Sequence, residues 1–165
     1  NCLAHVDGLT GAMNRRALDR DLNNANEQVN KGVDQLYLIL LDVDFFKLYN
    51  DNQGHLAGDR VLKHIVATMQ TVTDVDIYRY GGEEIAVLCN SHGNDISCAE
   101  LAEHLRSSIQ ALAIPHPDSP FGVVTVSAGV AYHSRGKDSD TLIFDADKAL
   151  YLAKSQGRNC AHLNT

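Results

Sequence analysis

The chain has 165 residues, of which 44% are hydrophobic and 21% are charged, and its formal net charge at pH 7 is -7. The length suits a single domain, and the hydrophobic content is sufficient for a buried core, which excludes a disordered chain. Because an acidic chain lacks the basic face that nucleic-acid binders normally present, we expect no nucleic-acid partner.

Cysteine usage and hydropathy indicate a cytoplasmic domain. The four cysteines are Cys2, Cys89, Cys98 and Cys160. They form no C-x-x-C pair and match neither a zinc site nor a secreted disulfide framework, so we expect reduced thiols. The longest apolar run, residues 36–41, is too short to cross a bilayer, and we expect this domain to make no membrane contact. Since the chain starts without methionine, we expect residues 1–165 to be one domain, the C-terminal part of a longer protein that can be membrane-anchored.

Apolar spacing predicts the first elements in chain order. Apolar residues recur every three or four positions over residues 18–29, which predicts a helix that Lys31-Gly32 ends. The unbroken apolar run of residues 36–41 predicts a strand covered on both faces. A short helix is expected to begin near Phe45, and a longer one to run over residues 56–69.

The second half predicts a hairpin inside a strand–helix alternation. Residues 77–80 and 85–89 are short apolar strands joined by a glycine-led turn, which favours antiparallel pairing. A helix, a proline-rich loop, a strand, a helix and an edge strand follow at residues 98–112, 115–120, 123–132, 141–154 and 159–163. This order predicts an α+β fold, an α/β sandwich with a central, mostly antiparallel five-stranded sheet flanked by helices.

Two carboxylates close the first predicted strand. Asp42 ends an apolar run, where an ionised carboxylate is seldom found without a partner. Period-two alternation places Asp44 on the same face of the sheet. Because hard divalent cations prefer oxygen ligands, the pair predicts a cation site. The alternative for Asp44 is a cap on the short helix that begins near Phe45.

The turn Gly81-Gly82-Glu83-Glu84 is the second candidate element. Adjacent glycines permit a tight turn, and two acids directly after them are costly unless something positive binds there. A hairpin tip can bring Glu83 against the end of the strand that carries Asp42, which would form a two-metal carboxylate site. The alternative is an ordinary exposed turn with two solvated acids.

Five segments together resemble the GGDEF family of diguanylate cyclases. They are residues 7–16, 42–59, 79–85, 124–130 and 146–159, which read DGLTGAMNRR, DVDFFKLYNDNQGHLAGD, RYGGEEI, VTVSAGV and ADKALYLAKSQGRN. They stand in the family's order and cover nearly the whole chain. The resemblance implies a fold like the palm of nucleotidyl cyclases and polymerases, and the condensation of two GTP molecules into cyclic di-GMP and two pyrophosphates.

The resemblance also implies residue roles. Asp42, Glu83 and the main-chain carbonyl of Val43 would hold two Mg²⁺ or Mn²⁺ ions. Glu83 would be the base for the 3′-hydroxyl, and Lys47 would be a second catalytic residue. The implied substrate-binding residues are Phe45, Phe46, Lys47, Asn50, His55, Asp59, Lys154 and Arg158. Of these, the lysines, the arginine and the two phenylalanine amides would meet the triphosphate, and Asn50 and Asp59 would bind guanine, with His55 nearby.

The implied reaction needs partners and leaves alternatives open. Each domain would hold one GTP, so catalysis requires a homodimer, and an upstream sensor or regulatory domain is expected. One alternative is a catalytically weak GTP-binding regulatory module. Another is a cyclase with a mixed adenine–guanine product, which Asp59 disfavours because its carboxylate suits the N1–H and 2-amino donors of guanine.

Two positions depart from the family pattern. Ile85 stands where the signature turn commonly ends in Phe, and we expect it to pack in the core with activity retained. Val72 and Val75 occupy the positions of an Arg-x-x-Asp product-binding motif found in many members. We therefore expect no feedback inhibition at that motif, although Asp74 and Asp76 flank it.

Overall fold

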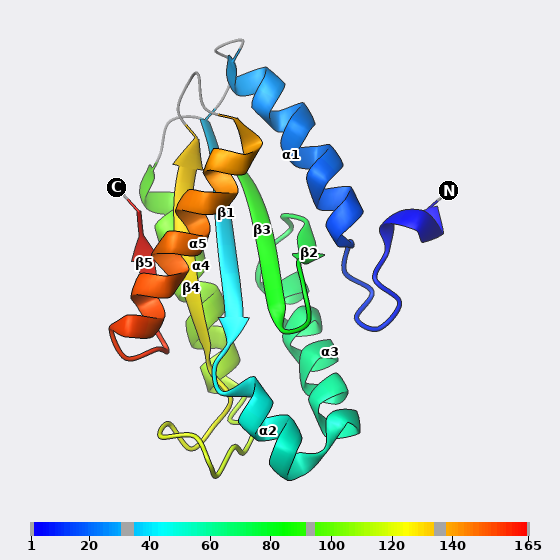
Figure 1. Ribbon diagram of the computed structural model, residues 1–165, viewed down its shortest axis with the longest axis vertical. Coiled ribbons are helices and arrows are strands. Elements are labelled where there is room, and N and C mark those ends of the chain that lie inside the picture. The colour runs from blue at the N-terminus through cyan, green and yellow to red at the C-terminus, as the bar shows by residue number, and fades with distance from the viewer. Residues whose placement is uncertain (1, 31–34, 92–94, 134–137, 165) are drawn as a thin grey trace.

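The protein is described here by a computed structural model that covers residues 2–30, 35–91, 95–133 and 138–164 (Figure 1). In chain order the elements are a 3-10 helix η1 (Cys2–His5), α1 (Arg15–Asn30), β1 (Gln35–Val43), α2 (Phe46–Gln53), α3 (His55–Val72), β2 (Ile77–Arg79), β3 (Glu84–Ser91), α4 (Asp95–Ala111), β4 (Val126–His133), α5 (Ser139–Ser155) and β5 (Ala161–Leu163). The predicted helix stop at Lys31-Gly32 lies outside the described residues.

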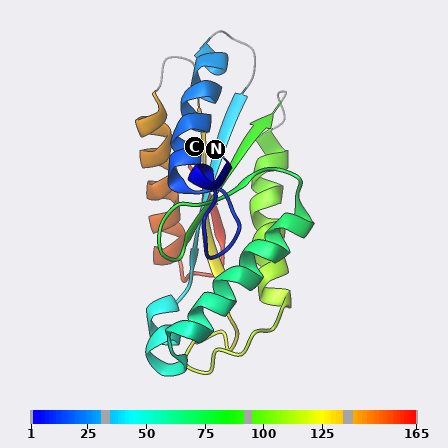
Figure 2. The ribbon, with the colours of Figure 1, turned by 90° about the vertical axis from the view of Figure 1, so that its right-hand side faces the viewer.

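The five strands form one sheet in the order β2-β3-β1-β4-β5. The pairs β2–β3, β3–β1 and β1–β4 are antiparallel, and only the edge pair β4–β5 is parallel. Helices α1 and α5 cover one face, and α3 and α4 cover the other (Figure 2). The predicted mostly antiparallel sheet flanked by helices is confirmed.

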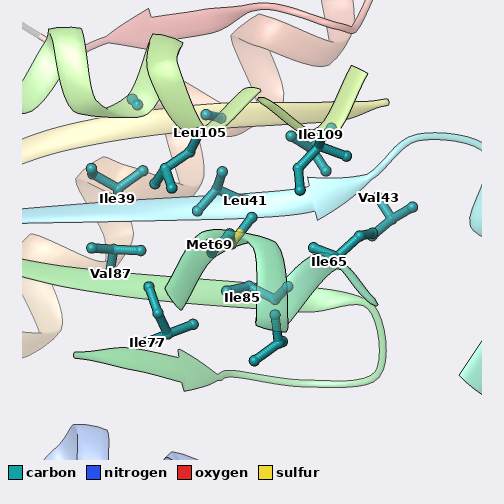
Figure 3. Packing of buried hydrophobic residues seen from close by; sticks show 14 of the residues in the cluster. Ile39, Leu41, Val43, Ile65, Met69, Ile77, Ile85, Val87, Leu105 and Ile109 are labelled. Carbon is teal, nitrogen blue, oxygen red and sulfur yellow. The ribbon is translucent and has the colours of Figure 1, made fainter. Parts of the chain in front are cut away.

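The central strand β1 contributes side chains to two hydrophobic clusters, one on each face of the sheet. Its odd-numbered residues from Tyr37 to Val43 belong to the cluster beneath α3 and α4, whereas Leu36, Leu38 and Leu40 belong to the cluster beneath α1 and α5. Period-two alternation of uniformly apolar residues buries both faces of the strand, as the sequence predicts. Figure 3 shows the first cluster, in which β1 packs against side chains of α3 and α4, among them Ile65, Met69, Leu105 and Ile109.

Helix α5 lies unusually close to β4 at Gly129. A Cβ atom at this position would stand 2.2 Å from the main-chain nitrogen of Leu150 and 2.5 Å from the carbonyl oxygen of Ala146. Only a residue without a side chain permits this approach. The close contact fixes the height of α5 over the sheet, and with it the position of Lys154 near the end of the helix.

One sequence expectation needs correction, and two are confirmed. Strand β4 begins at Val126 rather than at residue 123, because Val123 instead bridges Pro115 and closes the loop between α4 and β4. Helix α2 is separated from α3 by Gly54, whose φ of 90° ends the first helix before the second begins. Ile85 faces the core as expected, with 1% of its surface exposed.

Candidate functional site

The predicted site residues gather at one end of the sheet. Strand β1 ends there beside the β2–β3 turn, α2 starts there, and α5 finishes close by (Figure 1). The antiparallel register pairs Asp42 with Glu84, and the main-chain nitrogen of Val43 donates to the carbonyl oxygen of Glu83 at 3.3 Å. The ladder between β1 and β3 therefore places the diglycine turn directly against the end of β1.

Asp42 is a buried carboxylate with acidic neighbours. It is 6% exposed, and the ammonium group of Lys154 donates to its Oδ2 at 2.5 Å. Burial raises the pKa of Asp42 above its ordinary value, Lys154 opposes the shift, and the charges of Glu83 and Asp44 add to it. The carboxylate thus lies where additional positive charge would be favourable.

Glu84 shares this environment. Its pKa is also raised, first by burial and then by the charge of Asp42, with Lys154 opposing and Asp147 and Glu83 contributing smaller increases. Several acids therefore surround one ammonium group at the end of β1. Carboxylates with perturbed pKa values of this kind cluster at functional sites.

Asp44 has a different environment, although it follows two residues later on the same face. It is 3% exposed and accepts hydrogen bonds from Thr125 Oγ1 at 2.8 Å, Ser127 Oγ at 2.6 Å and the main-chain nitrogen of Asn159 at 3.0 Å. Among the described residues, no side chain caps the N-terminus of α2. The alternative that Asp44 caps this helix is therefore wrong, and its oxygens hold β4 and the segment after α5.

The start of α2 adopts an unusual backbone conformation. Phe45 has a φ of 55° in the left-handed region, which is uncommon for an aromatic residue. Its carbonyl oxygen lies 3.1 Å from Nε2 of the buried His116, and the guanidinium carbon of Arg158 lies 4.8 Å from the centroid of its ring. The structure thus brings Phe45 and Arg158 together. The left-handed conformation of Phe45 begins α2 at this end of the sheet, so the first main-chain amides of the helix lie there as well.

Asn50 and Asp59 lie on consecutive helices, α2 and α3. Asn50 packs over Gly58, where an added Cβ would stand 1.8 Å from its Oδ1. That buried oxygen accepts no hydrogen bond from the described residues. Asp59, which directly follows Gly58 in α3, is half-buried. An unpaired buried acceptor costs about 1–3 kcal/mol, so a ligand that donates to Asn50 would remove this cost.

The remaining predicted residues are less constrained. Lys47 and His55 are exposed, at the first turns of α2 and α3. Phe46 is buried and stacks on Tyr49 with ring centroids 6.5 Å apart. No group of three His, Cys, Asp or Glu side chains in the described part of the chain is arranged to hold a metal ion.

The sequence analysis missed the polar partners of Asp44. Thr125 and Ser127 alternate in an otherwise apolar stretch, and both hydroxyls face the end of β1. Polar residues at period two in a buried strand are the signal that could have identified them. It also missed Arg79, which pairs with Asp7 at 3.2 Å and donates to the carbonyl oxygen of Gly82 at 2.9 Å, thereby supporting the turn.

The chain is similar to known proteins over nearly its whole length. The family model for the diguanylate cyclase GGDEF domain matches residues 4–160. The chain is 40% identical over 163 residues to diguanylate cyclase VdcA of Vibrio cholerae, covering 94% of this chain and 46% of the relative. It is 34% identical over 162 residues to an uncharacterized membrane protein of Staphylococcus aureus, covering 96% and 45%. The chain therefore spans about half the length of these curated relatives.

Solved structures agree in fold. The GGDEF domain of DgcB from Caulobacter crescentus, in complex with c-di-GMP, has a TM-score of 0.89 at 32% identity, covering 98% of this chain and 96% of that one. Diguanylate cyclase SiaD of Pseudomonas aeruginosa, in complex with its activator SiaC, has a TM-score of 0.87 at 34% identity, covering 98% and 64%. Within the described residues, no helix has the length and apolar character to cross a membrane.

Proposed function

Because the chain belongs to the GGDEF-domain family of diguanylate cyclases, we propose that it condenses two GTP molecules into cyclic di-GMP and two pyrophosphates. The observation that carries the proposal is the junction of β1 with the diglycine turn. There the amide of Val43 donates to the carbonyl of Glu83, and Asp42 lies buried beside acids. Two distant segments thus contribute carboxylates to one place.

The donor set fits Mg²⁺ or Mn²⁺. Asp42, Glu83 and the carbonyl of Val43 offer only oxygen, which these hard cations prefer. Two bound ions would neutralise phosphate charge and lower the pKa of the attacking 3′-hydroxyl. Glu83 is proposed to accept the proton of that hydroxyl, because it lies on the turn beside Asp42 and is only partly buried.

Three cations and a helix start are suited to the triphosphate. Lys154 reaches the end of β1, and Arg158 lies over the ring of Phe45. Lys47 projects from the first turn of α2, whose leading amides at Phe45 and Phe46 suit an anion. Phosphoryl transfer depends mostly on positioning and charge neutralisation, which these groups would supply.

Asn50 and Asp59 are proposed to select guanine. The unpaired Oδ1 of Asn50 and the carboxylate of Asp59 are both acceptors, and guanine presents donors at N1 and at the 2-amino group. Adenine lacks those donors, so GTP is favoured over ATP. Exposed His55, at the start of α3, is proposed to lie beside the base.

The reaction implies further partners. Each domain is proposed to bind one GTP, so two domains must face each other as a homodimer. The longer relatives support an additional region in the whole protein, which we infer to be a sensor or regulatory domain. The catalytic domain would work in the cytoplasm. Val72 and Val75 are half-buried against the core, and no feedback inhibition is expected at their positions.

The test is turnover of GTP by the purified domain, alone and fused to a dimeric coiled coil. With Mg²⁺ we expect one cyclic di-GMP and two pyrophosphates per two GTP, separated by chromatography and identified by mass, and none after chelation of the metal. GTP binding without product in the forced dimer would favour a regulatory module instead. A mixed adenine–guanine dinucleotide from equal ATP and GTP would contradict the proposed role of Asp59.

A further inference from the structure

The segment after α5 holds two successive residues in the left-handed region. Arg158 has a φ of 65° and Asn159 a φ of 48°, directly after Gly157 at 117°. Asn tolerates this conformation, whereas Arg adopts it rarely and with backbone strain. Such a backbone persists only where surrounding contacts hold it. Since Arg158 is part of this turn, whatever holds the turn also positions its side chain. That side chain is proposed to meet the triphosphate.

Asn159 is the point at which the turn is held. Its main-chain nitrogen donates to Asp44 Oδ2 at 3.0 Å and lies 3.2 Å from Ser127 Oγ. Its side-chain Oδ1 accepts from Arg106 Nη1 at 2.7 Å. Asp44 directly follows β1 and Arg106 belongs to α4, so the residue beside Arg158 is held both by the end of the central strand and by a helix that covers one face of the sheet.

Arg106 is itself held in place. Its side chain is 14% exposed, its Nε donates to Glu103 at 2.9 Å, and its Nη1 also donates to Gln110 at 2.8 Å. The planar guanidinium group can make these bonds together because its donors project in a fixed fork. Arg106 therefore presents a charged donor to Asn159 with little freedom to move.

We propose that Arg106 is a positioning residue for the triphosphate: by holding Asn159 in the left-handed turn, it keeps the guanidinium group of Arg158 over the ring of Phe45. The inference rests on the proposed function, because only a bound GTP would supply the triphosphate that Arg158 is proposed to contact. The competing explanation is that Arg106 merely ties α4 to the chain before β5. The two explanations differ in whether the effect of Arg106 passes through Arg158.

The experiment is a double-mutant cycle on binding of a non-hydrolysable GTP analogue with Mg²⁺, measured by calorimetry on the whole chain. Arg106→Leu removes the charge-assisted bond and is expected to weaken binding about tenfold. Arg158→Ala should weaken binding at least as much. In the double variant, loss of Arg106 should add nothing, because its effect passes through the missing guanidinium group.

Matched variants separate positioning from stability. Glu103→Gln removes the negative charge beside Arg106 but keeps an acceptor oxygen for its guanidinium group and leaves the bond to Asn159, so we expect wild-type affinity. Arg106→Lys keeps a charged donor and should recover part of the loss. If Arg106→Leu does not fold, Asn159→Gly takes its place, since glycine accepts the left-handed φ and lacks only the side-chain acceptor.

Three results decide the matter. The inference is supported if the losses of affinity caused by Arg106→Leu and Arg158→Ala are not additive and occur only in variants of these two residues. Losses that add, or an Arg106→Leu variant that binds like the wild type, overturn the inference while leaving the proposed function standing. If the wild-type chain does not bind the analogue at all, the proposed function fails, and this inference fails with it.

Discussion

Asp42 lies near the end of β1 and Asp44 directly follows the strand, yet the surroundings of these two aspartates are opposite. Asp44 accepts from two hydroxyl groups and one amide, all neutral donors that belong to the protein. Asp42 accepts from the ammonium group of Lys154 and lies near Glu83 and Glu84. The first carboxylate has its charge satisfied by the fold, and the second lies among like charges.

The contrast indicates how one strand end can combine structure with function. A buried carboxylate that is fully hydrogen-bonded stabilises the elements that surround it. A buried carboxylate among like charges weakens the free protein and gains stability when a cation arrives. We therefore expect substitutions at the two positions to separate folding from activity.

The largest effect is expected on activity at Asp42 and Glu83. Asp42→Asn and Glu83→Gln each remove a charged oxygen proposed to bind metal, and product formation should fall about 1000-fold, comparable with the loss of an essential electrostatic contact. The thermal midpoint should stay the same or rise, because repulsion among the acids is relieved. Pyrophosphate release and a thermal scan on the same samples would measure both.

The exposed acid Asp140, at the start of α5, offers a control. Asp140→Asn changes the net charge by the same amount and should leave turnover unaltered. Full activity of Asp42→Asn with Mg²⁺ would show that this carboxylate is not a metal ligand.

The second effect concerns stability at Asp44. Asp44→Ala leaves the hydroxyls of Thr125 and Ser127 and the amide of Asn159 without their acceptor, and the free energy of unfolding should fall by about 3 kcal/mol. Urea denaturation followed by circular dichroism measures it. The comparison between the two aspartates would be wrong if Asp42→Ala proved more destabilising than Asp44→Ala.

Much of this arrangement is predictable from local sequence. The apolar run of residues 36–41 predicts a strand buried on both faces, and the alternation of Asp42 and Asp44 places both on one face. The glycine-led turn predicts the antiparallel hairpin that the register of β2 and β3 confirms. These features succeed because periodicity and turn chemistry act over a few neighbouring residues.

The remainder depends on contacts between distant segments. Asp44 and Asn159 are 115 positions apart, and Arg106 and Asn159 are 53 positions apart. No local pattern indicates that a carboxylate will find those partners, so the helix cap was an open alternative for Asp44. Similarly, β5 has only three half-buried residues, and its parallel pairing with β4 is set by the position of α5. Tertiary packing decides such short edges.

The smallest expected effect extends the comparison to Asp7, a third carboxylate held by donors. Burial alone would raise its pKa, but hydrogen bonds from the hydroxyl and amide of Thr10, together with the charge of Arg79, outweigh it and lower the pKa below the ordinary value of 3.8. A pKa lowered in the folded state stabilises the protein above the unfolded pKa. That contribution is lost as the pH falls through the folded value. The unfolding free energies of wild type and Asp7→Asn should therefore differ at about pH 6 and converge below about pH 3.

Asp19→Asn removes only an exposed ion pair with Arg15 and should show little difference at either pH. A gap between wild type and Asp7→Asn that widened on acidification would mean that the donors around Asp7 do not favour its ionised form.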